Sequence, residues 1–347
     1  MSCFSHAKRA RRYLFFISTI IFVTLFYSCS SYDYPKDYGF IERVSLPGHS
    51  DQVIDIDISY DGKYLASGSF DDTARVWDTE LFTELGESEV HPDDIYSVSL
   101  SDDMQYLATG CRDGAIRVYS LPDGELVHLM RGHAEEVYSI DFSPDGKQLL
   151  SGGKDTTVRV WDVQTGDLLK VLRGHGDAVN SVVVSINSEI GYSASNDGTV
   201  RAWYLQEDLA PGFIDKITRF ALTSIALSPD GKKIALTGMD KVLDKASNQW
   251  NKEFPLYIAD IGRNGIENIE MRLGHTKAVW GLAWAPDGKT IVTGGTDNRL
   301  FFHDVANSDN RQKVLPKVGS IWDLEFSPDG SKLFVASSSP DILVYMK

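Results

Sequence analysis

The sequence is poor in cysteine, in basic charge and in long hydrophobic runs, and each shortage excludes a class of protein. Three cysteines in 347 residues are too few for a disulfide-built scaffold. The 34 Lys and Arg residues are outnumbered by 49 Asp and Glu, so the net charge is −15. A chain this acidic repels phosphate backbones, and we expect no nucleic-acid partner. A single apolar run, residues 13–27, excludes a polytopic membrane protein.

Motifs of catalysis and cofactor binding are also missing. The sequence contains no GxSxG elbow, no HExxH pair and no phosphate-binding loop. Its paired aspartates, such as Asp71-Asp72 and Asp102-Asp103, lack the spacing of a calcium-binding loop. The sequence therefore predicts a protein that is not an enzyme and that holds no metal and no cofactor.

The first 28 residues have the layout of an export signal. Four bases within residues 8–12 precede the apolar run, and Ser28 and Ser30 follow it. As a helix this run would rise only about 22 Å, short of the ~30 Å core of a bilayer. We expect a signal peptide over residues 1–28, with an uncleaved signal anchor as the alternative.

Cys29 lies directly after the apolar run, in the order Ser28-Cys29-Ser30. This arrangement resembles the lipobox of bacterial lipoproteins, although Phe26 and Tyr27 depart from the residues preferred there. The resemblance implies cleavage before Cys29, acylation of that cysteine (for example by palmitate) and a linker over residues 29–39. It also implies anchoring in a bacterial cell envelope, on the outer-membrane, periplasmic or surface side. An incidental cysteine beside a plain signal is the alternative.

The rest of the chain repeats itself. A tight-turn signature of the type Ser-Pro-Asp-Gly, complete or degenerate, begins at seven positions: Ser59, Ser101, Ser143, Ser185, Ser228, Ala285 and Ser327. The intervals are 42 or 43 residues, except for one of 57. An alternating strand precedes each turn and further strands follow it, which predicts an all-β chain with four strands per unit.

Residues 40–347 resemble the WD40 family. The Gly-His that opens such repeats ends at His49, His133, His175 and His275, and Trp-Asp closes two of them at Trp77 and Trp161. The resemblance implies a seven-bladed β-propeller. Because the last repeat has only three strands, we expect the strand over residues 40–46 to complete the seventh blade.

The same resemblance implies a structural role for the histidines. In the family each belongs to a buried hydrogen-bond chain with an Asp, a Ser or Thr, and a Trp. The matching aspartates here are Asp71, Asp113, Asp155, Asp197 and Asp297, and the matching hydroxyl residues are Ser67, Thr109, Ser151, Ser193 and Thr293. With one histidine per blade, no pair is expected to bind a metal.

A partner surface is expected where each innermost strand begins. The seven equivalent positions hold Ile54, Tyr96, Tyr138, Asn180, Thr223, Trp280 and Trp322. In the family this position lies near the channel mouth, and aromatic residues are frequent in binding hot spots. Arg112 and Lys154 add charge in adjacent turns. The alternative is that these aromatic side chains simply pack between blades.

The 57-residue interval predicts a second recognition element. Its extra residues are placed over 240–253, between the second and third strands of blade five, as a loop that carries Trp250. A loop of this length is also tolerated without any function.

Together these features predict an exported, membrane-tethered, non-catalytic scaffold that binds a protein or peptide on the propeller face that carries the channel mouth and the blade-five loop. The alternative is an enzyme or small-ligand binder with its site in the channel. The alternative rests on five acidic residues of the innermost strands: Asp55, Asp57, Asp141, Asp323 and Glu325.

Overall fold

The computed structural model describes residues 39–347, except for 41, 207–211, 245–248, 309–310 and 315–317. The predicted signal over residues 1–28, Cys29 and the linker up to residue 38 lie outside the described residues and stay predictions. Among the residues described, no helix is long and apolar enough to span a membrane.

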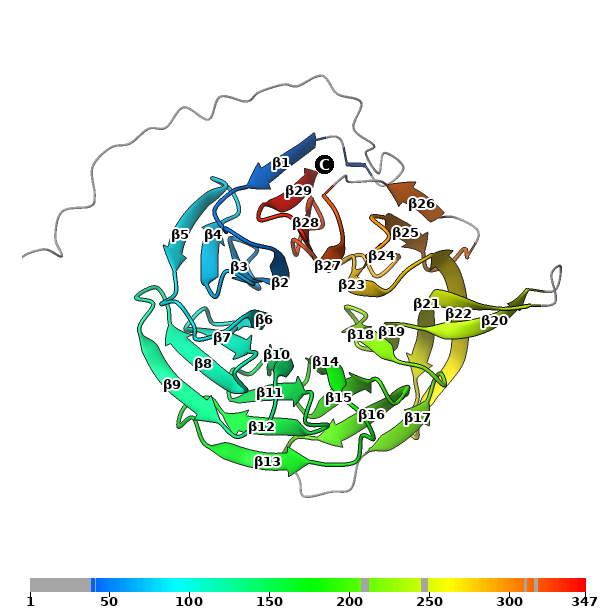
Figure 1. The fold of residues 1–347 in the computed structure, drawn as a ribbon, viewed down its shortest axis with the longest axis horizontal. Coiled ribbons are helices and arrows are strands. Elements are labelled where there is room, and N and C mark those ends of the chain that lie inside the picture. Colours follow the sequence, from blue (N-terminus) through cyan, green and yellow to red (C-terminus); the bar gives the residue numbers. More distant parts are fainter. Residues whose placement is uncertain (1–38, 41, 207–211, 245–248, 309–310, 315–317) are drawn as a thin grey trace, which may run out of the picture. The chain divides into compact units, whose positions relative to one another are not determined.

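Seven antiparallel sheets are arranged in a ring, with one strand of each sheet next to the centre (Figure 1). The innermost strands are β2 Val53–Ile58, β6 Ile95–Leu100, β10 Val137–Phe142, β14 Val179–Val184, β18 Leu222–Leu227, β23 Val279–Trp284 and β27 Ile321–Phe326. The second strands are β3 Tyr64–Ser69, β7 Tyr106–Cys111, β11 Gln148–Gly153, β15 Ile190–Ser195, β19 Lys233–Gly238, β24 Thr290–Gly295 and β28 Lys332–Ser337. The all-β, seven-bladed propeller expected from the repeat is confirmed.

Two further strands complete each blade outward. The third strands are β4 Ala74–Asp78, β8 Ala115–Ser120, β12 Val158–Asp162, β16 Thr199–Tyr204, β21 Gln249–Ile261, β25 Leu300–Asp304 and β29 Ile342–Met346. The fourth strands are β5 Thr83–Glu87, β9 Leu126–Arg131, β13 Leu168–Leu172, β17 Phe213–Lys216, β22 Ile266–His275, β26 Arg311–Val314 and β1 Glu42–Leu46.

The repeated turn forms by local chemistry. In blade one, Ser59 Oγ donates to Asp61 Oδ1 at 2.8 Å, and the same Asp61 oxygen accepts the backbone N–H of Lys63. Gly62 adopts a φ of 73°, in the left-handed region that favours glycine. Ser143 and Asp145 form the same bond in blade three at 2.7 Å. The short turn therefore returns the chain directly from the first strand of a blade to the second.

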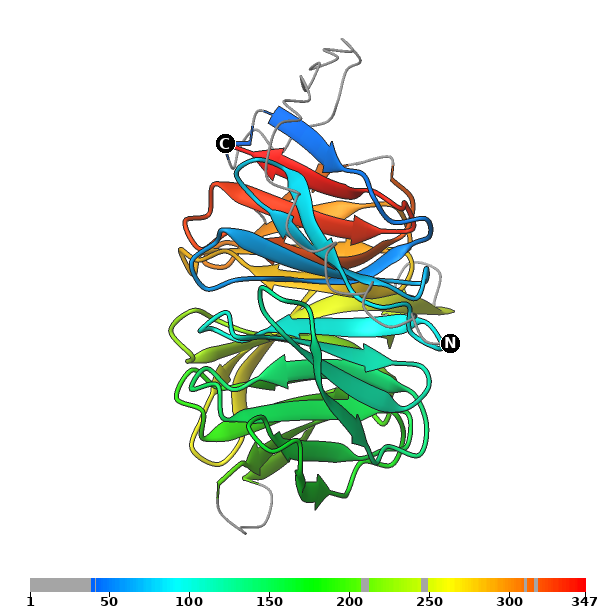
Figure 2. The same cartoon turned by 90° about the vertical axis from the view of Figure 1, so that its left-hand side faces the viewer.

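The ring closes through its two ends. Strand β1 pairs antiparallel with β29, from Glu42 opposite Met346 to Leu46 opposite Ile342 (Figure 2). Phe40, just before β1, is buried and packs against Phe302 of blade six and Phe326 of blade seven. The closing strand was therefore predicted correctly, although it begins at Glu42 rather than at residue 40.

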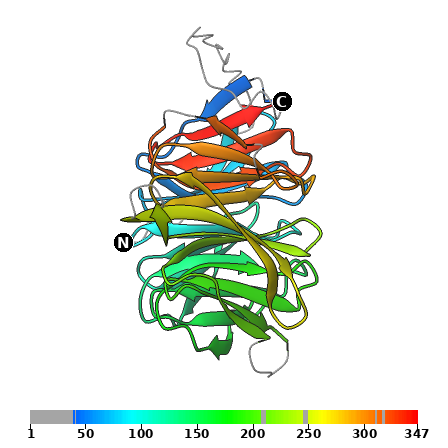
Figure 3. The ribbon, with the colours of Figure 1, turned by 90° about the vertical axis from the view of Figure 1, so that its right-hand side faces the viewer.

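Blade five carries the extra residues between its second and third strands, where they were expected. They form a β-ribbon and not a loop: β20 Asp240–Asp244 pairs with the beginning of β21, residue 244 opposite 249. Pairing satisfies main-chain N–H and C=O groups that an open loop would leave to water. The ribbon points outward from the ring, away from its centre (Figure 1), while the rest of β21 runs alongside β22 (Figure 3).

Candidate functional site

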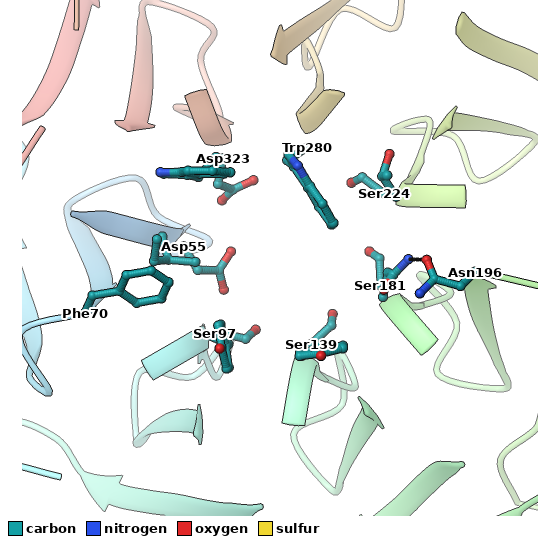
Figure 4. A pocket seen from close by; sticks show the side chains of 15 residues that line it. Asp55, Phe70, Ser97, Ser139, Ser181, Asn196, Ser224, Trp280 and Asp323 are labelled. Carbon is teal, nitrogen blue, oxygen red and sulfur yellow. Dashed lines mark hydrogen bonds between the residues drawn. The ribbon is translucent and has the colours of Figure 1, made fainter. Parts of the chain in front are cut away.

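The seven positions at the beginnings of the innermost strands meet at one cavity. It has a volume of about 440 Å³, and Ile54, Tyr96, Tyr138, Asn180, Thr223, Trp280 and Trp322 all line it. The other lining residues are Asp55, Phe70, Ser97, Ser139, Ser181, Asn196, Ser224 and Asp323. We call this cavity the mouth pocket (Figure 4). Its place at the channel entrance is the one that the family resemblance implied.

Three aromatic rings on one side of the mouth pocket form a continuous row. The ring centroids of Phe70 and Tyr96 are 5.7 Å apart and those of Tyr96 and Tyr138 5.5 Å apart, each pair close to perpendicular. Edge-to-face geometry of this kind is favourable and holds the rings in place. Tyr96 and Tyr138 are each partly exposed, so the row keeps a surface toward the cavity.

The two tryptophans complete the aromatic wall, and both are partly exposed. Trp280 leans into the cavity (Figure 4). The indole N–H of Trp322 donates to Gln52 Oε1 of blade one at 3.1 Å, which fixes its ring across the seam between the last blade and the first. All four predicted aromatic residues therefore lie on the cavity wall.

Below the aromatic wall lies a polar floor that joins neighbouring blades. Asp55 Oδ2 accepts the backbone N–H of Val98 at 2.7 Å, and Asp323 Oδ2 accepts that of Ile56 at 3.2 Å. Ser139 accepts the N–H of Val182 in the same way at 3.1 Å. The side chains that point into the cavity thus also hold the ring together.

The carboxyl groups of the channel have raised pKa values. Burial raises the pKa of Asp55 to about 6 and that of Asp57 to about 7. Burial raises the pKa of Asp323 well above its usual range, and the nearby Asp55 and Glu325 carboxylates raise it further. Because a low-dielectric wall disfavours charge, these acids retain protons at pH values where exposed carboxyls are ionised.

The side of the pocket opposite Asp55 and Asp323 is neutral and rich in amides (Figure 4). The side-chain amide of Asn180 donates to Asn196 Oδ1 and to the backbone carbonyl of Leu222, each at 2.7 Å. Thr223 donates to the carbonyl of Val279 in the next blade. This side offers hydrogen-bonding groups without net charge.

The two predicted basic residues lie outside the mouth pocket and are already paired. Arg112 Nη1 is 3.0 Å from Asp94 Oδ2, and Lys154 Nζ is 3.1 Å from Glu136 Oε1. Both side chains are about half exposed, at 50% and 46%. Both are therefore accessible at the surface, but their charges are balanced within their own blades.

Phe70 is the one aromatic lining residue that the sequence analysis missed; the polar lining residues not named there are Ser97, Ser139, Ser181, Asn196 and Ser224. Phe70 follows β3 as Arg112 follows β7 and Lys154 follows β11, so the repeat register itself contained the signal. Trp250 lies in the blade-five ribbon, opposite residue 243. The orientation of its side chain is outside the described part of the chain.

The predicted histidine chain is present in blade one. The indole N–H of Trp77 donates to Ser67 Oγ at 2.8 Å, Ser67 Oγ lies 2.7 Å from His49 Nε2, and His49 Nδ1 lies 2.9 Å from Asp71. The Asp71 carboxylate only accepts, so His49 Nδ1–H donates to it; in the neutral imidazole Nε2 then accepts the Ser67 O–H, while Ser67 Oγ accepts the indole N–H. Although burial opposes it, the bonds from His49, Thr73 and the backbone hold the pKa of Asp71 well below its usual range.

The same chain recurs in three other blades. Its members are His133, Asp155, Ser151 and Trp161 in blade three, His175, Asp197, Ser193 and Trp203 in blade four, and His275, Asp297 and Thr293 in blade six. In blade six His303 replaces the tryptophan, 3.0 Å from Thr293. A buried chain whose members satisfy one another stiffens each blade.

Blade two departs from this pattern. His91 bonds to Thr109 at 3.0 Å and to the hydroxyl of Tyr119 at 3.2 Å, whereas Asp113 forms an ion pair with Arg117 at 2.6 Å. The expectation that Asp113 belongs to the histidine chain is corrected on this point. Burial, with the nearby Arg117, lowers the pKa of His91 to about 4, so this histidine is neutral at physiological pH.

Within the described residues, no group of three or more His, Cys, Asp or Glu side chains has the arrangement of a metal site. Cys111 is buried, donates to the carbonyl of Asp93, and has a pKa raised by burial to about 11. A thiol in this state is a poor nucleophile.

Known proteins share the repeat. A WD repeat-containing protein of Synechocystis sp., described as uncharacterized, is 25% identical over 143 residues. The match covers 33% of this chain and 41% of that relative, so the chain spans less than half the length of the relative.

The family described as WD domain, G-beta repeat matches this chain over residues 41–78, 82–120, 124–162, 166–204 and 268–304, together more than half of its length. The unmatched stretches include most of blades five and seven, which lack the opening Gly-His. Proteins of this family generally bind protein partners and are generally non-catalytic. The chain therefore belongs to the WD40-repeat family.

Proposed function

We propose that this protein is an exported, membrane-tethered scaffold that binds a protein or peptide partner at the mouth pocket and performs no catalysis. One observation carries the proposal: all seven equivalent strand positions converge on a single cavity, and four of them hold partly exposed aromatic residues. Tyrosine and tryptophan combine large contact area with a polar tip, which is why they dominate binding hot spots.

The binding site is tested by replacing both tryptophans. Wild type and the Trp280→Ala/Trp322→Ala variant are crosslinked to their neighbours in native membranes and purified. The control is Tyr60→Ala: Tyr60 is 76% exposed and follows the end of β2 opposite to Ile54, on the other face of the ring. We expect a partner captured by wild type and Tyr60→Ala to be lost from the double variant.

Circular dichroism of the double variant establishes that its fold is intact. Capture of the same partner by a folded double variant would contradict the proposal and would leave the blade-five ribbon, with Trp250, as the next surface to test.

The tether is proposed from the sequence pattern around Cys29 alone. Labelling cells with a palmitate analogue should mark wild type and the Cys3→Ala control, while Cys29→Ala should stay unlabelled. The mature wild-type chain should have an intact mass that begins at Cys29. Labelling of Cys29→Ala, or a mass that begins at Met1, would overturn this part of the proposal.

A further inference from the structure

The mouth pocket is acidic and has no basic counterpart. Among the described residues that line it are two carboxyl groups and no Lys, Arg or His. Three further acids, Asp57, Asp141 and Glu325, lie one step deeper on the same innermost strands. A ligand that enters the pocket therefore meets negative charge that the wall itself does not balance.

The two lining carboxyls lie together although 268 positions of sequence separate them. Asp323 accepts the N–H of Ile56, the residue after Asp55, and the two side chains are within hydrogen-bond reach of each other. Close carboxyls with no basic neighbour cannot both be ionised at low cost, so a proton is retained between them. A positively charged group of a ligand that enters the pocket can replace that proton.

The wall above these acids suits the rest of a cationic side chain. Tyr96, Tyr138, Trp280 and Trp322 present ring faces and edges around the entrance, with Phe70 behind Tyr96. Aromatic faces attract an ammonium or guanidinium group, and they also pack against the methylene stem that carries it. The amides of Asn180 and Asn196 on the opposite side can bond to a peptide backbone.

We propose that the mouth pocket binds the side chain of an arginine or lysine from an extended segment of the partner, with its charged end between Asp55 and Asp323. A cavity of about 440 Å³ holds a side chain and its flanking backbone but not a folded domain. This inference rests on the proposed function, since it assumes that a protein docks at this face.

The test is a selection from a displayed library of random linear peptides on the full chain in detergent. We expect the enriched peptides to share one Arg or Lys. Replacing that Arg by citrulline, or that Lys by norleucine, should weaken binding at least ten-fold. The Asp55→Asn/Asp323→Asn variant should show the same loss, because an amide oxygen still accepts the N–H groups of Val98 and Ile56 but carries no charge.

The matched control is Asp57→Asn/Glu325→Gln, which removes two carboxyls one step deeper, outside the pocket lining, and should retain most of the affinity. Circular dichroism confirms that both double variants fold.

The failures of the two proposals are distinguishable. Peptides that need Trp280 and Trp322 but bind equally well to Asp55→Asn/Asp323→Asn would overturn the cation inference and leave the docking face intact. If no enriched peptide depends on Trp280 and Trp322, both the inference and the proposed docking face are overturned.

Discussion

The two sides of the channel differ in the charge of the residues on their innermost strands. The third and fifth residues of each innermost strand are its wall positions. In blades seven, one and three these positions include Asp323, Glu325, Asp55, Asp57 and Asp141. The equivalent positions of blades four, five and six hold Ser181, Val183, Ser224, Ala226, Gly281 and Ala283. One side is acidic, apart from Ser97 and Ser99 of blade two and Ser139 of blade three, and the other is neutral, although the backbone repeats almost unchanged.

The acidic side joins its blades by side chains that accept backbone N–H groups. Asp57 bonds to Leu100 and Asp141 to Val184, each at 2.6 Å. The neutral side joins its blades by uncharged donors, Asn180 and Thr223, that bond to backbone carbonyls, and by close packing, as where Gly281 lies against Leu324 of blade seven. Buried carboxyls carry a desolvation cost that packing avoids, so an acidic side that is retained at this cost is the natural place for a function.

Moving a carboxyl to the neutral side should have the largest effect. A Cβ at residue 281 would lie 2.9 Å from Leu324 Cγ, and Leu324 is fully buried. We expect Gly281→Asp to lower the free energy of unfolding by roughly 2–4 kcal/mol, through overpacking and an added buried charge. Denaturant titration measures it. Ala226→Asp, at a wall position that already has a Cβ, should cost less; equal costs would show that close packing is not what distinguishes this side.

Raising the pH should lower the stability of the folded protein through the carboxyl groups of the acidic side. Burial places the folded-state pKa of Asp57 at about 7 and those of Asp141, Asp323 and Glu325 well above their unfolded values, so folding retains protons and stability falls as pH rises through this range. Between pH 6.5 and 8, we expect the melting temperature to fall by a few degrees, at about 2–4 °C per kcal/mol.

Other groups change little in this window. Asp71 and Asp155 pair with histidines, and their pKa values lie far below this window. Burial lowers the pKa values of His133 and His175, so these two residues reduce the stability of the protein only below about pH 6.5. The variant Asp57→Asn/Glu325→Gln should flatten the dependence. A slope as steep as that of wild type would show that these carboxyls are not its source.

Replacing two equivalent serines by alanine compares the bonds between blades on the two sides. Ser139→Ala removes the acceptor of the Val182 N–H on the acidic side, and we expect a loss of about 1 kcal/mol in the free energy of unfolding. Ser224 occupies the equivalent position of blade five, where the described residues show no such bond to β23, and Ser224→Ala should cost less than about 0.5 kcal/mol. Equal losses in thermal or denaturant unfolding would contradict the division of the channel into two sides.

The smallest effect is expected outside the channel. Arg112 is half exposed and pairs with Asp93 and Asp94 in solvent, where ion pairs contribute about 0–1 kcal/mol. Arg112→Ala should leave stability within about 0.5 kcal/mol of wild type and leave peptide affinity nearly unchanged. A ten-fold loss of affinity would extend the binding surface from the pocket to its rim.

Local features of this protein could be predicted because they repeat at short range. The Ser-x-Asp-Gly turns, the alternating strands and the spacing from His49 to Asp71 are contained within one blade, so the sequence pattern reports them directly. Blade two was predicted incompletely: Asp113 pairs with Arg117, and His91 Nδ1 bonds to the backbone carbonyl of Glu89 instead. The blade-five ribbon was predicted as a loop, because its polar residues lack the alternation that marks a strand.

The sequence alone determined the repeat, the number of blades and the closing of the ring by the first strand, since each depends on periodicity and on counting strands. Only the tertiary structure decided that the aromatic residues line a cavity rather than pack between blades, that Phe70 joins them, and that Asp55 and Asp323 meet. The physical reason is distance along the chain. The mouth pocket is lined by one to three residues from each of seven blades, and these residues meet only once the ring has closed.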